Sequence, residues 1–211
     1  MAVFRRRNKE SISIVLDLKR LCVFCGSSSG FDAVYRQAAV DLGQLVAAQR
    51  IELVYGGGRV GLMGAIADAV LQAGGHVIGV IPEFLATKEL LHEEVSQMRV
   101  TNDMHERKAL MSELSDAFVA MPGGLGTFEE LFEVLTWSQL GLHGKPVGLL
   151  NVAGYFDPLL AMVDRAIADG FCANEHRQLF VVDTNPANLL DRLRAHQLPN
   201  VKKWIRSTEE T

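Results

Sequence analysis

The sequence lacks an excess of basic residues and any long hydrophobic run. Its 211 residues carry a formal net charge of −4, which gives no electrostatic support for binding nucleic acid. No apolar run is long enough to span a bilayer. The basic N-terminal start is not followed by the apolar core of a signal peptide. We therefore expect a cytoplasmic protein with neither a nucleic-acid partner nor a membrane partner.

Cysteine is also scarce, with only Cys22, Cys25 and Cys172 in the whole chain. Cys22 and Cys25 have the spacing of a redox pair, but such a pair normally stands at a helix N-terminus. Both lie in the apolar run 21–25, where a separation of three places them on opposite faces of a strand. The favoured interpretation is that both pack in the core.

Several motifs that indicate a particular catalytic class are missing. The six histidines are scattered, and no H-E-x-x-H or paired cysteine–histidine spacing occurs, so we expect no protein-bound catalytic metal. The chain has neither the G-x-x-x-x-G-K-[ST] loop of an ATPase nor the G-x-S-x-G elbow of a serine hydrolase. With 48% hydrophobic residues, it has enough apolar side chains for one domain with a substantial core.

What the sequence does contain is a regular alternation of two kinds of segment. Strands are expected near 20–25, 51–55, 76–81, 97–101, 117–121, 146–150 and 180–182, and helices near 32–49, 61–73, 103–114, 127–140, 156–169 and 186–196. A short helix at 83–86 is a further candidate. This order predicts an α/β fold with a Rossmann-like, doubly wound parallel sheet and helices on both of its faces. We expect a single domain over 20–198, preceded by a flexible basic arm (1–19) and followed by a tail (199–211).

Three glycine-rich turns follow three of the expected strands, at Gly26–Gly30, Gly56–Gly61 and Pro122–Gly126. Parallel strands end at the same edge of a sheet, so these turns can converge on one ligand where the strand order reverses. Glycine lets a ligand approach the backbone closely, and the N–H groups that begin a helix can hold a phosphate. The alternative is that glycine turns are simply common in α/β proteins.

Two carboxylates follow the third turn. Glu129 and Glu130 are expected in the first turn of the next helix, within reach of whatever the phosphate is attached to, although the helix dipole alone also favours acids there. In the helix expected at 103–114, Arg107 lies within an apolar stripe and Lys108 lies at its edge. A buried cation needs an anionic partner, so these two side chains either snorkel to water or face a ligand anion or the two glutamates.

Four segments occur together in one order: Tyr55–Gly58, Gly61–Gly64, Met104–Lys108 and Pro122–Glu130. This set resembles the LOG (Lonely Guy) family of cytokinin riboside 5′-monophosphate phosphoribohydrolases, over about residues 21–171. Members of that family hydrolyse the N-glycosidic bond of a nucleoside 5′-monophosphate and release the free base and ribose 5-phosphate. The resemblance implies a Rossmann-like fold, at least a homodimer, and no cofactor.

The resemblance also implies roles for individual residues. Arg107 and Glu130 match the family's catalytic arginine and glutamate. We assign substrate binding to Lys108, Glu129 and the glycine-turn residues, with Glu89 and Thr136 as outlying contacts; the turn residues are Gly57, Gly58, Gly123, Gly124, Gly126 and Thr127. When the C1′–N9 bond breaks, a carboxylate can stabilise the oxocarbenium-like ribose, and a guanidinium can stabilise the anionic groups.

Two other functions stay open. One is a non-catalytic nucleotide or cofactor carrier, because Gly56-x-Gly58-x-x-Gly61 also fits the dinucleotide fingerprint. The other is a lysine decarboxylase, a label that proteins with this pattern have carried; that chemistry normally needs pyridoxal phosphate on a lysine, and only Lys108 is suitably placed. The sequence also leaves open whether the preferred base is plain or N6-prenylated adenine, and which of Glu129 and Glu130 dominates catalysis.

Two of the expected helices indicate a homodimer. The helix at 61–73 has Asp68 as its one charged residue and many glycine and alanine residues, and the helix at 127–140 is apolar on more than one side. One domain core rarely covers two faces of a helix. We therefore expect a partner subunit to cover them, with the site near the interface.

Overall fold

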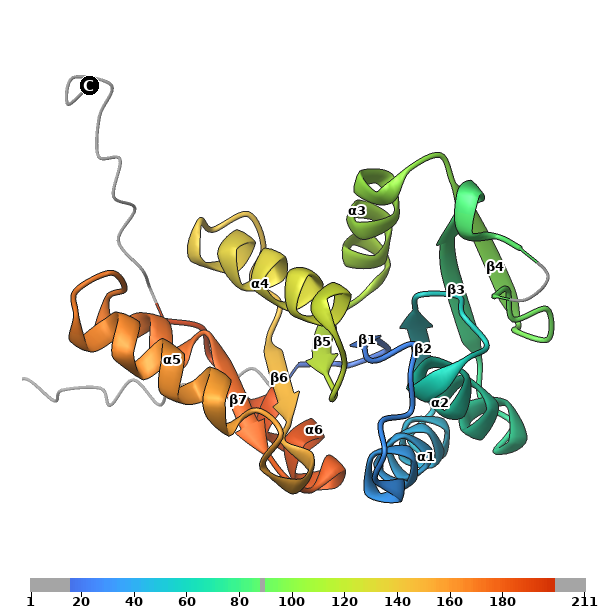
Figure 1. Cartoon of the computed structure of the whole chain (residues 1–211), viewed down its shortest axis with the longest axis horizontal. Coiled ribbons are helices and arrows are strands. Elements are labelled where there is room, and N and C mark those ends of the chain that lie inside the picture. Colours follow the sequence, from blue (N-terminus) through green and yellow to red (C-terminus); the bar gives the residue numbers. More distant parts are fainter. Residues whose placement is uncertain (1–15, 88–89, 200–211) are drawn as a thin grey trace, which may run out of the picture.

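The computed structural model describes residues 16–87 and 90–199 as one parallel sheet covered by helices on both faces (Figure 1). The sheet has the strand order β4-β3-β2-β1-β5-β6-β7, and every neighbouring pair is parallel. Its strands are β1 Arg20–Phe24, β2 Glu52–Tyr55, β3 Val77–Pro82, β4 Gln97–Thr101, β5 Ala117–Ala120, β6 Val147–Leu150 and β7 Phe180–Asp183. The predicted doubly wound fold is confirmed.

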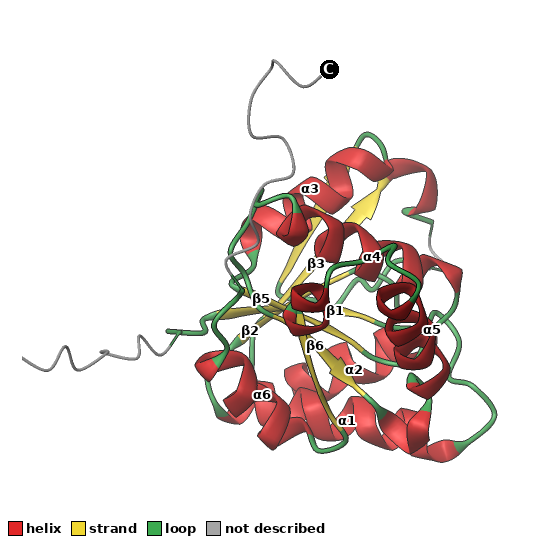
Figure 2. Ribbon diagram, turned by 90° about the vertical axis from the view of Figure 1, so that its left-hand side faces the viewer, coloured by secondary structure: helices red, strands yellow, loops and turns green. Residues whose placement is uncertain are grey.

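Within residues 16–87 and 90–199, six α-helices and three short 3-10 helices connect or follow the strands. They are α1 Ala33–Ala48, α2 Gly61–Gln72, α3 Met104–Leu114, α4 Leu125–Gln139, α5 Asp157–Ala168, α6 Pro186–Ala195, η1 Glu83–Leu85, η2 Val152–Gly154 and η3 Asn174–Gln178. Figure 2 shows α1, α2 and α6 on one face of the sheet and α3, α4 and α5 on the other. Every α-helix and strand expected from the sequence is present, and the 83–86 candidate is η1.

The strand order reverses between β1 and β5. The chain builds β1 to β4 in one direction, then returns through α3 to place β5 on the other side of β1. Ligands of open α/β sheets bind beyond the carboxyl ends of the strands at such a reversal. Two of the glycine turns leave the sheet at this point, one after β1 and one after β5.

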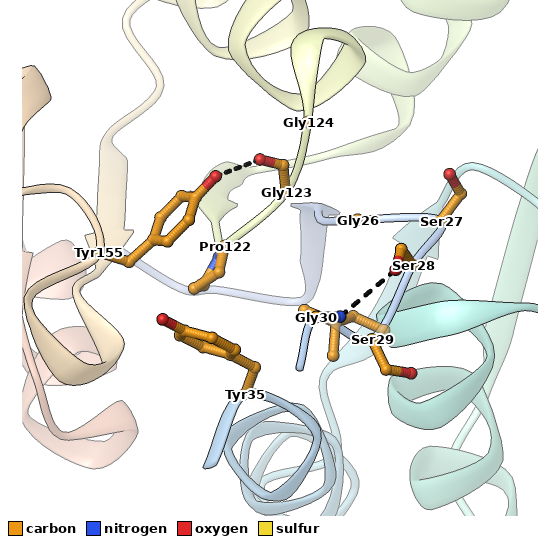
Figure 3. A pocket seen from close by; sticks show the side chains of 11 residues that line it. Gly26, Ser27, Ser28, Ser29, Gly30, Tyr35, Pro122, Gly123, Gly124 and Tyr155 are labelled. Atoms are coloured by element: carbon orange, nitrogen blue, oxygen red, sulfur yellow. Dashed lines mark hydrogen bonds between the residues drawn. The ribbon is translucent and has the colours of Figure 1, made fainter. Parts of the chain in front are cut away.

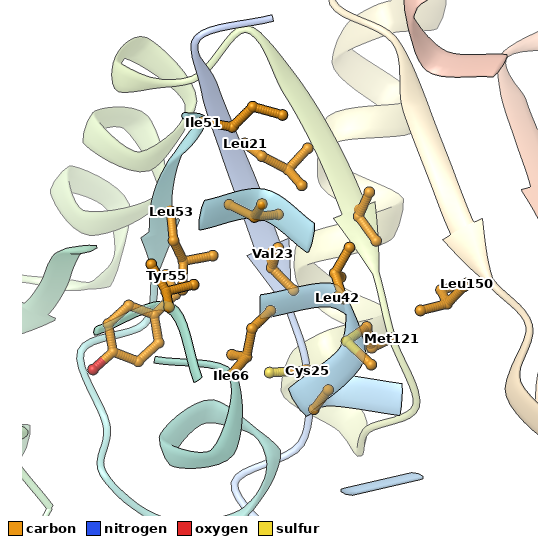
Figure 4. Close-up of a cluster of buried hydrophobic side chains, with 14 of the residues drawn as sticks. Leu21, Val23, Cys25, Leu42, Ile51, Leu53, Tyr55, Ile66, Met121 and Leu150 are labelled. Atoms are coloured by element: carbon orange, nitrogen blue, oxygen red, sulfur yellow. The ribbon is translucent and has the colours of Figure 1, made fainter. Parts of the chain in front are cut away.

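The two neighbouring cysteines pack on opposite faces of the sheet, as predicted. Cys22 belongs to the core between the sheet and α3–α5, and Cys25 belongs to the core beneath α1 and α2 (Figure 4). Both thiols are buried, and this burial raises the pKa of each. Because the thiolate is the reactive form, these residues act as core packing.

One expected boundary is wrong, with a consequence for the acids that follow it. Helix α4 begins at Leu125 rather than at 127, because Gly124 has extended dihedral angles (φ −94°, ψ −156°) and serves as its N-cap. Glu129 and Glu130 therefore lie in the second turn of α4, not in the first. The dipole effect, which fades beyond the first turn, does not explain their presence.

The expectation that a partner subunit covers α2 is also wrong. Most of α2 is buried within the chain itself, where it packs against α1 so closely that a Cβ added to Gly43 would lie 2.8 Å from the Cβ of Ala69. Small residues in α2 thus serve contact between two helices of one chain. Helix α4 differs, because its Leu125 side chain remains 86% exposed.

The ends of the chain are described only in part. Residues 1–15 of the expected arm and 200–211 of the expected tail lie outside the described residues. Next to them, the N–H of Leu16 donates to the carbonyl of Arg194 over 3.0 Å, and Leu18 is buried. Residues 16–18 therefore pack on the domain. No helix within 16–87 or 90–199 is long and apolar enough to cross a membrane.

Candidate active site

The three glycine turns meet at the carboxyl edge of the sheet, as predicted. The N–H of Gly26 donates to the carbonyl of Pro122 over 3.0 Å, and the carbonyl of Gly26 accepts from the N–H of Leu62 over 3.0 Å. Gly26 of the first turn thus binds the third turn and the start of α2, the helix that follows the second turn. A Cβ on Gly26 would lie 3.3 Å from the Cα of Gly123 and 2.8 Å from the carbonyl oxygen of Ser28, so the close approach requires glycine.

A cavity of about 220 Å³ opens between the first and third turns. Its walls are Gly26–Gly30, Pro122–Gly124, Tyr35, Leu62 and Tyr155 (Figure 3). Neither tyrosine is expected at the site from the sequence, because each stands alone in its segment. The signal that would have found Tyr155 is its place just after β6, the strand beside β5 at the same sheet edge.

Helix α4 directs its first turn at this region. Gly124 offers no side chain to cap it, and the N–H groups of Leu125, Gly126 and Thr127 have no acceptor within the helix because it begins there. A Cβ on Gly124 or Gly126 would meet no heavy atom within 4 Å. The start of α4 therefore presents N–H donors without acceptors inside the helix, open space and the positive end of the helix dipole, a combination suited to an anion.

Gly123 has a different reason to be glycine. A Cβ at this position would collide with the hydroxyl of Thr127 and would lie 2.8 Å from the backbone nitrogen of Gly26. Thr127 is itself buried. Both predicted contact residues thus shape the turn.

The predicted catalytic residues Arg107 and Glu130 form an ion pair between α3 and α4. The Arg107 Nη1 to Glu130 Oε1 distance is 2.9 Å, and Arg107 Nε also donates to the carbonyl of Val80 over 3.0 Å. Arg107 is only 8% exposed and Glu130 only 9%, so snorkelling is excluded for Arg107. A Cβ on Gly56 would collide with the guanidinium, so the second glycine turn packs directly against Arg107.

Glu130 has an unusual electrostatic environment. Burial raises the pKa of its carboxyl group above the ordinary value, and the charge and hydrogen bond of Arg107 oppose this effect without cancelling it. Perturbed carboxyl groups with a specific charge partner are common at active sites. Neither Arg107 nor Glu130 lines the cavity. Glu130 stands six residues after Gly124, about 9 Å along α4.

Lys108 and Glu129 form a separate and more exposed network. The Lys108 ammonium group contacts the Glu129 carboxylate and lies 3.0 Å from the Glu133 carboxylate. Burial lowers the pKa of Lys108, but the two carboxylates more than offset this, so its pKa is raised. The Glu129 side chain is 51% exposed, in contrast to buried Glu130.

The other predicted contact residues are more dispersed. Gly57 and Gly58 pack beneath residues 90–92: the carbonyl of Gly57 accepts from the N–H of His92, and Gly58 pairs with Leu91. Neither glycine lines the cavity. Thr136 is exposed and lies nine residues after Thr127, about 13 Å along α4. Glu89 lies outside the described residues.

Within the described part of the chain, no group of three or more His, Cys, Asp or Glu side chains is arranged to hold a metal ion. The site consists of backbone donors, hydroxyl groups, the Arg107–Glu130 pair and the Lys108 network. Such a set can bind an anion, stabilise charge of either sign and supply a carboxylate to a reacting centre.

Comparison with solved structures identifies the same fold in a molybdenum cofactor binding protein and in a molybdenum cofactor carrier protein. A molybdenum cofactor binding protein from Rippkaea orientalis aligns with a TM-score of 0.61 at 25% identity, covering 80% of this chain and 91% of that one. A molybdenum cofactor carrier protein from Chlamydomonas reinhardtii aligns with a TM-score of 0.62 at 24% identity, covering 81% and 92%.

Comparison of sequences gives much greater similarity to another group of proteins. A probable cytokinin riboside 5′-monophosphate phosphoribohydrolase of Oryza sativa subsp. japonica is 58% identical over 175 residues, 83% of this chain and 77% of that protein. A cytokinin riboside 5′-monophosphate phosphoribohydrolase of Arabidopsis thaliana is 52% identical over 182 residues, 86% and 80%. Residues 63–193 also match a family described as possible lysine decarboxylase. The chain therefore belongs to the LOG family of cytokinin riboside 5′-monophosphate phosphoribohydrolases.

Proposed function

We propose that this protein hydrolyses the N-glycosidic bond of adenosine 5′-monophosphate or its N6-modified forms to the free base and ribose 5-phosphate. The names of its relatives and their identity of 52–58% support this proposal. The observation that carries it is the buried Arg107–Glu130 pair, which stands one to two turns beyond the start of α4, where no side chain caps the helix. A phosphate bound at that start would leave the sugar within reach of the pair.

In the proposed reaction, the 5′-phosphate binds the N–H groups at the start of α4 and the glycine turns, and this binding positions the ribose. As the bond between C1′ and the base breaks, the Glu130 carboxylate stabilises the oxocarbenium-like sugar or activates water. Against the larger effect of burial, the charge and hydrogen bond of Arg107 lower the pKa of Glu130 and so favour its carboxylate form. Arg107 also stabilises the anionic groups. Lys108 and Glu129 complete the substrate contacts.

The carrier and decarboxylase alternatives are less well supported. The solved carriers share the fold at 24–25% identity, far below the identity to the hydrolases. Burying a charged pair costs desolvation energy, and a passive carrier has no evident use for it. The Lys108 amine, which a decarboxylase would need free for a pyridoxal cofactor, is engaged by Glu129 and Glu133.

A homodimer with its site near the interface is part of the proposal. Helix α4 exposes Leu125 and Phe132, its C-cap Leu140 is also exposed, and the adjacent α5 has no buried residue and a 56% exposed Met162. An apolar surface of this kind favours a second copy as its cover. Thr136 lies too far from the glycine turn to contact the same phosphate in one chain, so we assign its substrate contact to the neighbouring subunit's site.

Light scattering at micromolar concentration tests the dimer. The wild type should have the mass of two chains, and Phe132→Asp should shift it toward one chain. A wild-type monomer would contradict the proposal. A cytoplasmic location is also proposed; the three free cysteines fit a reducing compartment, and cell fractionation tests it.

A product assay tests the reaction. Purified protein is incubated with AMP, with N6-isopentenyl-AMP and with adenosine, and the products are separated by chromatography. We expect free base and ribose 5-phosphate from the monophosphates, and far slower cleavage of adenosine because it has no anion for the start of α4. Recovery of both nucleotides intact would instead support the carrier. The ratio of the two monophosphate rates gives the base preference.

A further inference from the structure

Tyr155 contacts the glycine turn through its hydroxyl group, which donates a hydrogen bond to the carbonyl oxygen of Gly123 (Figure 3). That carbonyl belongs to the peptide unit between Gly123 and Gly124. Neither residue has a side chain to restrict rotation of this unit, so a hydrogen bond can decide its orientation. In a trans peptide the C=O and N–H groups point in opposite directions, so the bond directs the N–H of Gly124 away from Tyr155.

The tyrosine ring is held in place by three aromatic neighbours. It packs edge-on against Tyr35 and Phe156, with ring centroids 5.9 Å and 5.2 Å away, and it stacks on Phe128 at 6.4 Å. Phe128 belongs to α4 and Tyr35 to α1. The hydroxyl position is therefore fixed by packing against both helices that flank the cavity.

The loop that carries Tyr155 is strained and firmly anchored. Ala153 adopts left-handed dihedral angles (φ 51°, ψ 29°), which cost free energy in a residue with a Cβ. The buried Asn151 side chain accepts from the N–H of Phe156 and donates to Asp157, both over 2.7 Å. Strain of this kind persists only where the surroundings impose it, and here it brings Tyr155 to the turn.

We propose that Tyr155 is a positioning residue for the phosphate end of the substrate. It holds the Gly123–Gly124 peptide so that the N–H of Gly124 joins the donors at the start of α4. If the peptide rotated, the Gly123 carbonyl dipole would face the anion and repel it. This inference rests on the proposed function, in which this turn binds the 5′-phosphate, and it extends the site to the β6–α5 connection.

The test is Tyr155→Phe, which removes only the hydroxyl and keeps the ring contacts. Calorimetry should show that the Kd of ribose 5-phosphate rises about tenfold, as expected for one lost neutral hydrogen bond, while the Kd of free adenine stays unchanged. The KM for AMP should rise by a similar factor with kcat within about twofold, because the chemistry at C1′ is untouched. The Tm should fall by no more than about 2–4 °C, the shift expected for one lost hydrogen bond in a domain of this size.

The matched control is Tyr55→Phe. Tyr55 is fully buried, and its hydroxyl has no hydrogen-bond partner among the described residues, so this variant removes a tyrosine hydroxyl that does not contact the third turn. Its Kd for ribose 5-phosphate should match that of the wild type.

Three results would overturn the inference: a Tyr155→Phe protein with an unchanged Kd for ribose 5-phosphate, one that loses adenine affinity equally, or a wild type that does not bind ribose 5-phosphate. A wild type that binds ribose 5-phosphate but cleaves no nucleotide would reject the proposed reaction alone. The tenfold shift in Kd would then still decide the role of Tyr155.

Discussion

The sharpest prediction concerns the charge of Glu130. Glu130→Gln keeps the shape of the side chain and retains an oxygen that can accept the hydrogen bond from Arg107. In the wild type, Arg107 Nη1 lies 2.9 Å from Glu130 Oε1. What it removes is the negative charge. Because Glu130 is only 9% exposed, water cannot easily replace the lost charge in the transition state.

The size of the effect follows from Coulomb's law. A carboxylate about 4 Å from a full positive charge contributes about 4 kcal/mol at an effective dielectric constant of about 20. An oxocarbenium-like transition state carries part of that charge at C1′, so we take about half to three quarters of this value. A loss of about 2–3 kcal/mol corresponds to a decrease in kcat on the order of a hundredfold.

The assay measures kcat at saturating AMP by the release of adenine. Glu113→Gln is the matched control: it makes the same change in an exposed glutamate of α3 that has no place in the site, and should leave kcat within about twofold. Glu129→Gln decides the assignment within the pair. Near-normal turnover by Glu130→Gln with an inactive Glu129→Gln would reverse that assignment, and activity in both would refute the mechanism.

Three further predictions concern the same site. Because burial raises the folded-state pKa of Glu130, kcat should fall on the acid side at a higher pH than an ordinary glutamate would give, and the pH profile of Glu130→Gln should lack this acid limb. Since the folded-state pKa is raised, the contribution of Glu130 to stability should decrease as pH rises through that pKa. Arg107→Ala should abolish most activity and lower the free energy of unfolding in urea by about 3 kcal/mol, because it leaves Glu130 buried without its cation; an unchanged urea midpoint would contradict this. Gly123→Ala should weaken ribose 5-phosphate binding measured by calorimetry, because its Cβ would collide with Thr127, whereas Gly144→Ala, where an added Cβ meets nothing within 4 Å, should bind normally.

Much of this architecture is local in origin and could be predicted from the sequence. Short apolar runs alternating with amphipathic segments fix the strands and helices, since each pattern buries its apolar residues in only one kind of element. The start of α3 is local in origin too, because the Asp103 carboxylate caps the helix by accepting from the N–H of Glu106 over 2.8 Å. Glycine turns after three of the expected parallel strands predict a ligand site because such strands end at one edge.

Other features depended on packing between distant segments, and only the tertiary structure decided them. The pairing of Arg107 with Glu130 rather than Glu129 depends on where α4 begins and how it is rotated against α3. The burial of α2 depends on α1, which the periodicity of α2 alone does not reveal.

Tyr155 shows the same limit most clearly. It stands 32 residues from Gly123 in the sequence, in a loop with no motif of its own. Local patterns encode the backbone elements because their causes lie within a few residues. Contacts between side chains and distant turns exist only once the sheet has brought the segments together. The sequence therefore determined the glycine turns, and the tertiary structure determined that Tyr155 contacts the third of them.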